Sequence, residues 1–409
     1  MKNKTDDAMT EQQQKSSPSA TFYQLVKVIY APFKAFKEIT QSPKYLGPIL
    51  VLILFVAANI GYGYAILSRS HIERTLPSFD PSIEQFDVWT ENATLWASIP
   101  RANITEDFND FINGSYYGNR SIAFSIASSS KISMELMNIG PANCSGSDGY
   151  KNMSLKIKVV HPTIAPSNAS IYLFSGSNSS YFYYNLKDVF SDNATSIWNN
   201  LTIPLATENW VNKDADWSHI TGIKLEFSLP ENSNISILVD GLFFRGIFQT
   251  PLDTDATTYL SVYAFTSLVQ FVFRWVLMSG IIVIITRAFG THTARKPILV
   301  SVGFAFIFFV VQTLANTVII QSTLPNLYYS LELLGGTPTE IEIAATKMSD
   351  ATGLYFNMTG LIQLGIFIWI DILCAIATRL TTGLSWAKSM IASAIALFAA
   401  YLIGLFFGF

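Results

Sequence analysis

Residues 45–67 read YLGPILVLILFVAANIGYGYAIL and contain no charged side chain. A run of about 20 apolar residues is long enough to cross a bilayer as a helix. Half of the 409 residues are hydrophobic and only 13% are charged, which is more apolar than is usual for a soluble chain. The sequence therefore predicts an integral membrane protein with an all-α bundle of five transmembrane helices. The last four lie within residues 259–409, at about 262–286, 298–320, 354–377 and 386–408.

A long segment of different composition, residues 68–258, separates the first span from the second. It is rich in Asn, Ser and Tyr and carries 20 acidic against 12 basic side chains. Apolar and polar residues alternate with a period of two in several stretches, and turn residues separate these stretches. The pattern predicts an inserted all-β antiparallel sandwich. The alternating stretches are 121–127, 154–160, 223–228 and 235–239.

The distribution of Lys and Arg predicts the orientation in the membrane. Residues 1–44 carry seven basic side chains, whereas the loop 321–353 carries only Lys347. Basic residues accumulate on the cytoplasmic side of a membrane. We expect a cytoplasmic N-terminus, with the β-domain and Phe409 outside the cytoplasm, and the cell membrane as the location.

The N-terminal region has two parts. Residues 1–20 are polar and predict a disordered cytoplasmic tail. Residues 21–44 predict an amphipathic helix that Pro32 should kink or split. This helix lies either on the inner membrane surface or against the protein's own cytoplasmic side. A cytoplasmic protein partner would bind within residues 1–40.

The predicted β-domain contains many acceptor sites for N-linked glycans. Of its 18 asparagines, 11 begin an Asn-X-Ser/Thr sequence, where chance would give roughly four. This excess independently predicts that the domain faces a glycosylating exterior, and Asn357 adds one acceptor at the outer end of the fourth span. The 11 acceptors are Asn92, Asn103, Asn113, Asn119, Asn143, Asn152, Asn168, Asn178, Asn193, Asn200 and Asn234.

Two charged residues fall inside the predicted spans, where a lone charge costs at least about 2.5 kcal/mol. Arg274 lies near the middle of the second span and Asp371 in the inner half of the fourth. We expect them to pair, either as a link between helices or as part of an ion path. The polar side chains expected to assist them are Gln270, Gln312, Asn316 and Gln363.

Aromatic residues and one aspartate are the candidate ligand groups of the β-domain. Tryptophans either stack on a sugar ring or fill the sandwich core. Asp240 either helps to hold a structural calcium ion or stabilises a turn. The tryptophans concerned are Trp89, Trp96, Trp198, Trp210 and Trp217.

Sequence signatures of catalysis are absent, and we assign no catalytic residue. The four histidines have no metal-ligand spacing, and there is no nucleophile elbow or phosphate-binding loop. Cys144 falls in the predicted β-domain and Cys374 towards the inner end of the fourth predicted span, which excludes a disulfide framework. A net charge of −3 argues against a nucleic-acid partner.

The segment VIYAPFKAFKEITQSPKYLGPILVLILF, residues 28–55, together with residues 262–409, resembles the Yip family of small membrane proteins. The resemblance consists of a Pro-Phe pair, a second proline in QSPKY, and five spans with a cytoplasmic N-terminus. Eukaryotic members are associated with small GTPases and vesicle traffic. The resemblance therefore implies a trafficking adaptor, although the large inserted domain departs from the family pattern.

A second resemblance lies in the β-domain. The stretches 198–205, DW at 216–217, 220–227 and LVDGLFF at 238–244 are similar to the closing strands of galactose-binding-like jelly rolls of the carbohydrate-binding-module type. The resemblance implies a jelly-roll fold, and the fold hosts many roles.

Two functional hypotheses follow. In the first, the protein is a non-enzymatic adaptor whose β-domain contacts a glycan or an envelope protein while the bundle serves as anchor. In the second, the bundle is a transporter or channel, or its accessory subunit, and uses Arg274 and Asp371. A water-filled path lined by both residues would favour the second hypothesis.

Overall fold

The computed structural model describes residues 18–78, 88–190, 195–291 and 294–406, with side chains from residue 21 onward. The chain forms two compact units. The helical unit contains the residues up to Ser70, Thr250–Asn326 and the residues from Ala351, and the β unit contains His71–Gln249 and Leu327–Asp350. The β unit thus includes part of the loop between the third and fourth spans, which the sequence does not assign to the β-domain.

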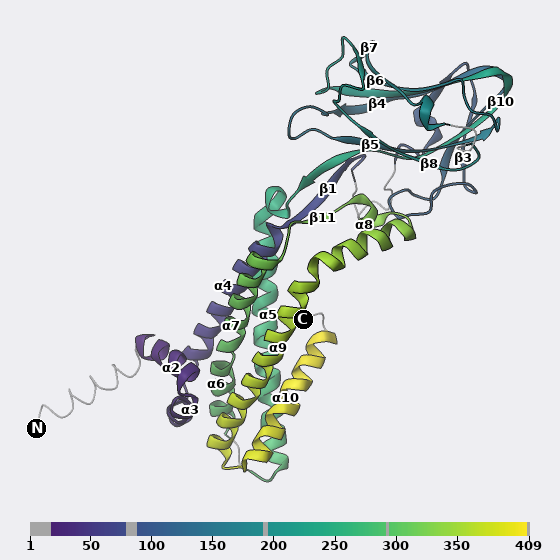
Figure 1. The fold of residues 1–409 in the computed structure, drawn as a ribbon. Coiled ribbons are helices and arrows are strands. Elements are labelled where there is room, and N and C mark those ends of the chain that lie inside the picture. Colours follow the sequence, from purple (N-terminus) through teal and green to yellow (C-terminus); the bar gives the residue numbers. More distant parts are fainter. Residues whose placement is uncertain (1–17, 79–87, 191–194, 292–293, 407–409) are drawn as a thin grey trace, which may run out of the picture. The chain divides into compact units, whose positions relative to one another are not determined.

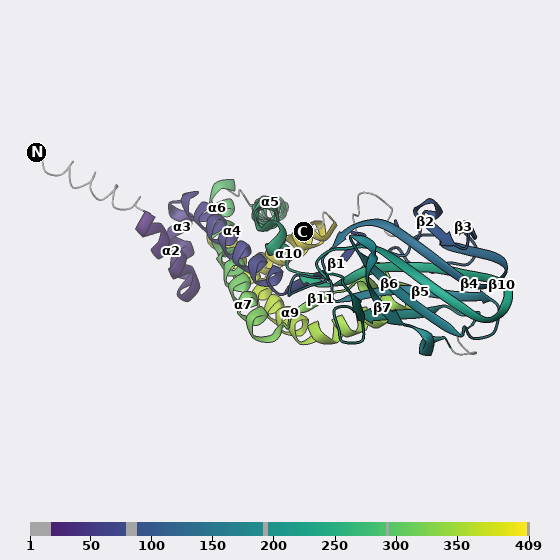
Figure 2. The same ribbon diagram turned by 90° about the horizontal axis from the view of Figure 1, so that it is seen from above.

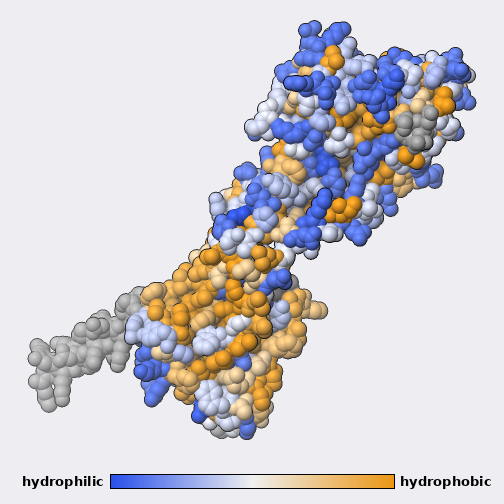
Figure 3. Space-filling view, viewed as in Figure 1, coloured by the Kyte–Doolittle hydropathy of each residue, from blue (hydrophilic) through white to orange (hydrophobic). Residues whose placement is uncertain are grey.

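Five helices of the described chain are long and apolar enough to cross a membrane, which confirms the predicted helical bundle. The surface of the helical unit in Figure 3 is predominantly hydrophobic. Two helices, α5 and α9, extend beyond their predicted spans. In α5 the reason is a capping box between Thr250 and Asp253, which starts the helix well before residue 262. The helices are α4 (Leu46–Leu67), α5 (Pro251–Ala288), the pair α6 (Arg295–Ala305) and α7 (Ile307–Thr323), α9 (Pro338–Thr382) and α10 (Trp386–Phe406).

Two short helices precede the bundle, α2 (Pro18–Tyr30) and α3 (Pro32–Gln41). They are separate because Pro32 lacks the N–H group that a continuous helix requires. Leu25 and Phe36 belong to the buried core of the bundle, so this region packs on the protein's own helices. Other apolar side chains of these two helices stay exposed, namely Phe22, Val26, Ile29 and Phe33. The predicted tail falls mostly outside the described residues.

The β unit is an antiparallel β-sandwich of two layers, as predicted (Figure 1, Figure 2). One layer has the strand order β2-β4-β10-β6-β7-β9, and the other has β3-β4-β10-β5-β8. The strands are β1 (Ser70–Leu76), β2 (Trp96–Ile99), β3 (Asn103–Asp107), β4 (Ser121–Ala142), β5 (Asn152–His161), β6 (Asn168–Ser175), β7 (Ser177–Asn185), β8 (Asn199–Pro204), β9 (Val211–Lys213), β10 (Ile220–Gln249) and β11 (Leu327–Tyr329).

The strands β4 and β10 belong to both layers. The first half of β10 pairs with β6 and its second half with β5, and the register against β4 shifts between Ser228 and Ser233. The alternating stretches at 223–228 and 235–239 are therefore one bent strand. Between the layers, apolar side chains from both form one continuous core.

Residues 327–350 complete the β unit. In the sheet, β11 lies next to β1, and α8 (Leu331–Gly335) and the first turns of α9 follow it. The backbone N–H of Tyr116 donates to the carbonyl of Gly335. Tyr116, Tyr117, Phe243 and Leu331 form a small buried cluster of their own. We call residues 331–350 the docked segment.

Candidate functional site: an aromatic face of the β-sandwich

A group of tyrosines lies on the outer face of the first layer. Pairing places Lys224 of β10 opposite Tyr172 of β6, and Tyr172 opposite Tyr183 of β7. Tyr181 lies two residues from Tyr183, so its side chain points to the same side of the sheet. The alternate residues of β6, such as Leu173, point into the core. We call Tyr172, Tyr181, Tyr183, Lys224 and Glu226 the tyrosine face.

The rings of this face contact one another. The ring centre of Tyr172 lies 5.3 Å from that of Tyr181 and 5.2 Å from that of Tyr183, both in edge-to-face arrangements. Such pairs stabilise each other beyond their buried area. All three rings are partly exposed. The strands therefore hold three aromatic rings in fixed positions at the surface.

Charged groups lie among these rings. The ammonium group of Lys224 lies 3.8 Å from the centre of the Tyr172 ring and 3.6 Å from the Glu226 carboxylate, which also pairs with Lys131 at 3.1 Å. Burial raises the pKa of the Tyr172 hydroxyl above its ordinary value. Aromatic rings beside donors and acceptors on rigid strands suit a ligand with both apolar and hydroxyl-bearing faces.

These tyrosines do not figure among the residues predicted from the sequence. The signal was present, because Tyr181-Phe-Tyr-Tyr184 places two rings on each side of a strand. Phe182 is fully buried, and Tyr184 packs against the core. Only the pairing of β7 with β6 shows that Tyr181 and Tyr183 share a face with Tyr172.

The second layer carries a similar pair of side chains on its outer side, but the docked segment covers it. The ammonium group of Lys156 lies 3.9 Å from the centre of the Tyr117 ring. It forms an ion pair with Glu340 of α9 at 2.9 Å, and the Tyr117 hydroxyl donates to the same carboxylate. Lys156 and Tyr117 are only 5% and 3% exposed, so this arrangement holds the chain's own segment in place.

A second ion cluster secures the docked segment. The guanidinium of Arg245 donates to both Glu73 of β1 and Glu332 of α8. Glu73 also accepts a hydrogen bond from the backbone N–H of Leu331. Burial alone would raise the pKa of Glu332, but the hydrogen bonds and charge of Arg245 outweigh it and lower the pKa to about 2. Glu332 is therefore ionised throughout the physiological range.

The five tryptophans fill structural positions in the β unit. Trp89, Trp96 and Trp210 are buried in the core. Trp217 is partly buried and stacks on a core phenylalanine with ring centres 3.8 Å apart. Trp198 is also partly buried, and its indole N–H donates to Asp110 at 2.9 Å. None of the five tryptophans belongs to the tyrosine face.

Asp240 lies at a bulge of β10 and is fully buried. Its carboxylate accepts hydrogen bonds from the backbone N–H groups of Ile112 and Gly241 and from the Thr90 hydroxyl. Gly241 has a φ of +58°, which Asp240 stabilises through this contact. In the part of the chain that the structure describes, no group of three or more His, Cys, Asp or Glu side chains is placed to hold a metal. A calcium ion at Asp240 stays a prediction.

The predicted glycan acceptors lie at accessible positions wherever they are described. Three are partly exposed, Asn92, Asn152 and Asn168, and Asn193 lies outside the described residues. The others are exposed, namely Asn103, Asn113, Asn119, Asn143, Asn178, Asn200, Asn234 and Asn357. None of the described acceptors would require the domain to unfold for modification, and their use stays a prediction.

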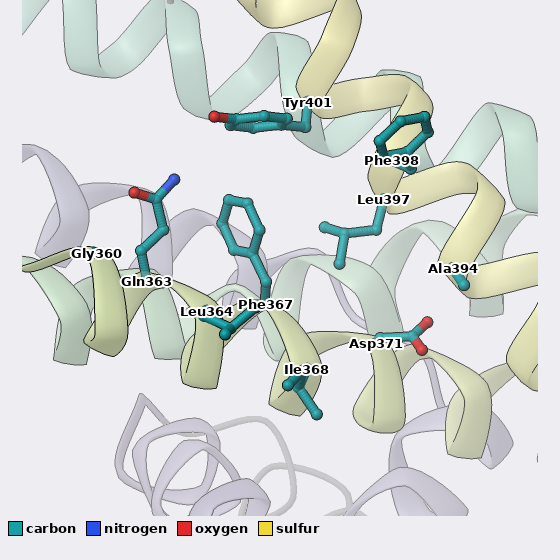
Figure 4. Close-up of a pocket in the computed structure, with 10 residues that line it drawn as sticks. All are labelled: Gly360, Gln363, Leu364, Phe367, Ile368, Asp371, Ala394, Leu397, Phe398 and Tyr401. Carbon is teal, nitrogen blue, oxygen red and sulfur yellow. The ribbon is translucent and has the colours of Figure 1, made fainter.

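The structure does not pair Arg274 with Asp371, which corrects the expectation from the sequence. Asp371 accepts a hydrogen bond from the Ser393 hydroxyl of α10. Figure 4 shows it at one end of a groove of about 490 Å³ between α9 and α10, with Gln363 and Tyr401 at the other end. Arg274 lines a different cavity, among α4, α5 and α7.

Comparison with known proteins finds only distant structural similarity. No protein-family model matches the chain, and no curated protein matches its sequence, so the resemblance to the Yip family stays an expectation. A family 11 carbohydrate-binding module from Clostridium thermocellum, in complex with a β-1,3-1,4-mixed-linked tetrasaccharide, is 13% identical. The match covers 43% of this chain and 96% of the module, with a TM-score of 0.27.

Two further solved structures have similarly low TM-scores. A family 30 carbohydrate-binding module of a Clostridium thermocellum cellulosomal cellulase is 10% identical, over 40% of this chain and 96% of the module, with a TM-score of 0.29. A β-1,2-glucanase from Parabacteroides distasonis is 15% identical, over 39% of this chain but only 25% of the enzyme, with a TM-score of 0.28.

Proposed function

We propose that this protein is a membrane-anchored, non-catalytic contact protein whose tyrosine face binds a saccharide polymer. The observation that carries the proposal is the row formed by Lys224, Tyr172 and Tyr183 across three paired strands. Sugar rings have apolar faces that stack on aromatic rings and hydroxyl groups that hydrogen-bond at their edges. The tyrosine face offers both kinds of contact on a rigid support, and the helical bundle holds it at a membrane.

We also propose the orientation and the finer role of the bundle. In this proposal the N-terminus is cytoplasmic and the β unit lies outside, which the Lys and Arg bias of residues 1–44 and the exposed glycan acceptors support. The exposed apolar side chains of α2 and α3, such as Phe22 and Phe33, would then meet either the inner membrane surface or a cytoplasmic partner. The latter would make the protein an adaptor, as its resemblance to the Yip family implies.

The test of saccharide binding uses the full chain in detergent micelles or nanodiscs. Wild-type protein should be retained on at least one member of a panel of immobilised polysaccharides. Tyr172→Ala and Tyr183→Ala should each weaken retention about tenfold or more, because stacking and the adjoining contacts are lost together. Phe108→Ala is the control, since Phe108 is an exposed aromatic residue of the same unit that packs on Arg120.

Two outcomes would contradict the proposal. Wild-type protein would be retained on none of the polysaccharides, or the tyrosine variants would bind as tightly as Phe108→Ala. Capture of a protein partner that the tyrosine substitutions abolish would assign the same face to protein recognition instead.

A further inference from the structure

A polar cavity of about 160 Å³ lies inside the helical unit, among α4, α5 and α7. Phe55 and Phe309 form part of its wall. Its polar lining groups come from all three helices, and each lies well within a predicted membrane span. They are Asn59, Tyr62, Gln270, Arg274, Gln312 and Asn316.

Several of these polar groups have no partner in the described part of the chain. Arg274 Nε and Asn316 Oδ1 are buried and accept or donate no hydrogen bond there. Neither Gln270 nor Gln312 makes a side-chain hydrogen bond to any described residue. By contrast, the Asn59 amide donates to a carbonyl of its own helix. The hydrocarbon core of a bilayer offers no water to such groups, so leaving them unsatisfied destabilises the fold.

The charge of the cavity points to the kind of occupant that would satisfy them. Arg274 is cationic, and no described carboxylate forms an ion pair with it, because Asp371 is bonded to Ser393 instead. Its guanidinium group lies 6.0 Å from the centre of the Phe309 ring. A guanidinium group fits two oxygen atoms of a carboxylate or phosphate side by side. The amide groups of Gln270 and Gln312 would supply further N–H donors.

We propose that this cavity binds an anionic oxygen group, a carboxylate or a phosphate, with Arg274 as its main ligand. Asn316 joins the donors by turning its side-chain amide, whose oxygen and nitrogen are interchangeable in shape. The group belongs either to a small soluble anion or to the headgroup of a lipid, and both present the same chemistry. This site is independent of the tyrosine face, which belongs to the β unit.

The experiment uses the full chain, purified in detergent and freed of bound lipid. Thermal loss of helical circular dichroism is followed while sodium acetate or sodium phosphate replaces sodium chloride at constant ionic strength. We expect a saturable rise of the unfolding midpoint for the wild type. Arg274→Gln should raise the half-saturating anion concentration about tenfold or more, as expected for loss of a charged hydrogen bond.

Controls separate binding from general effects of salt and from misfolding. Arg379→Gln removes another arginine of the helical unit, which contacts Trp386 outside this cavity, and should respond as the wild type does. Gln312→Met keeps the charge and a similar volume, so this variant should fold even if Arg274→Gln does not. Because it removes an amide donor from the cavity, it should weaken the response to the anion. A second arm compares nanodiscs of phosphatidylcholine with nanodiscs that also contain phosphatidylglycerol, and counts retained lipids by native mass spectrometry.

The outcomes are distinct. A response to free anions that Arg274→Gln or Gln312→Met weakens establishes a soluble anion as occupant. A response to the anionic lipid alone, weakened by the same changes, establishes a headgroup. If neither anions nor anionic lipid stabilise the wild type, or if both cavity variants respond as Arg379→Gln does, the proposal is wrong.

Discussion

The two outer faces of the β-sandwich use the same pair of side chains in opposite ways. Lys156 lies 3.9 Å from the ring centre of Tyr117, and Lys224 lies 3.8 Å from that of Tyr172. On the face of Lys156 and Tyr117, which we call the covered face, Glu340 of the docked segment pairs with the lysine, and the lysine and the tyrosine are both buried. On the tyrosine face the acid is Glu226, which comes from the same strand as Lys224, and the tyrosine rings stay partly exposed. The comparison shows that the chain's own docked segment occupies one lysine–tyrosine arrangement, whereas the other stays partly exposed.

The largest expected effect concerns the ion cluster on the covered face. Arg245→Met leaves the buried Glu73 and the partly buried Glu332 without their cation, so the β unit should lose about 3 to 5 kcal/mol of unfolding free energy. Lys131→Met on the tyrosine face removes an ion pair in which the lysine is half exposed, and should cost less than about 1 kcal/mol. Chemical unfolding of the full chain, followed by tryptophan fluorescence, compares the two. Equal losses would mean that the docked segment is not held by this cluster.

The next largest effect should be the pH dependence that the acids of the covered face give to the unfolding free energy. The folded-state pKa of Glu332 is about 2, below its ordinary value of 4.5, so its stabilising effect is complete above about pH 5 and lost as pH falls towards 2. The pKa of Glu340 is also lowered, because hydrogen bonds from Thr337 and Lys156 outweigh its burial. We expect the unfolding free energy to fall by about 2 to 3 kcal/mol between about pH 5 and pH 2.

The pH experiment measures unfolding of wild type and Glu332→Gln between pH 7 and pH 2. The variant should be less stable at pH 7 but lose less stability on acidification. Glu91 acts in the opposite direction, since burial raises its pKa and protonation relieves its cost in the fold. Parallel pH profiles for wild type and variant would mean that the pKa of Glu332 is the same in the folded and unfolded states, which would contradict the prediction.

A smaller effect distinguishes the two lysines directly. Lys156→Met deprives Glu340 of its ion-pair partner in a buried position and should cost about 1 to 3 kcal/mol. Lys224→Met should cost less than about 1 kcal/mol, because Glu226 keeps its pair with Lys131. The two unfolding free energies are measured side by side. A reversed order would break the comparison between the faces.

Much of the architecture follows from sequence patterns, because a bilayer and a sandwich each impose a clear periodicity. Runs of apolar residues mark the five helices, and alternation marks the strands. What local patterns cannot show is which distant segments pair. The polar stretch at 231–234 suggests a turn, although it is the bend of a single strand, and β11 contains only three residues, Leu327–Tyr329.

The same limit applies to the functional residues. Arg274 and Asp371 are predicted to pair because each needs a partner, but their sequence positions do not fix the direction in which each helix face points. The structure directs Asp371 to Ser393 and Arg274 to the polar cavity. Likewise, the sequence makes the tryptophans candidate ligand residues, yet four of the five lie in or against the core, whereas Tyr172, Tyr181 and Tyr183 stay partly exposed.

The most direct test of the account is the accessibility of individual tyrosine side chains in the full chain. Hydroxyl-radical footprinting with mass spectrometry should modify Tyr181 and Tyr183 readily and leave Tyr116 and Tyr117 unmodified, since the last two are only 2% and 3% exposed. Adding a saccharide that retains the protein should protect the partly exposed tyrosines of the tyrosine face, Tyr172, Tyr181 and Tyr183, and no tyrosine outside it. Rapid modification of Tyr117, or no protection of Tyr181 and Tyr183 at saturating saccharide, would contradict the assignment of one face to the chain itself and the other to an external ligand.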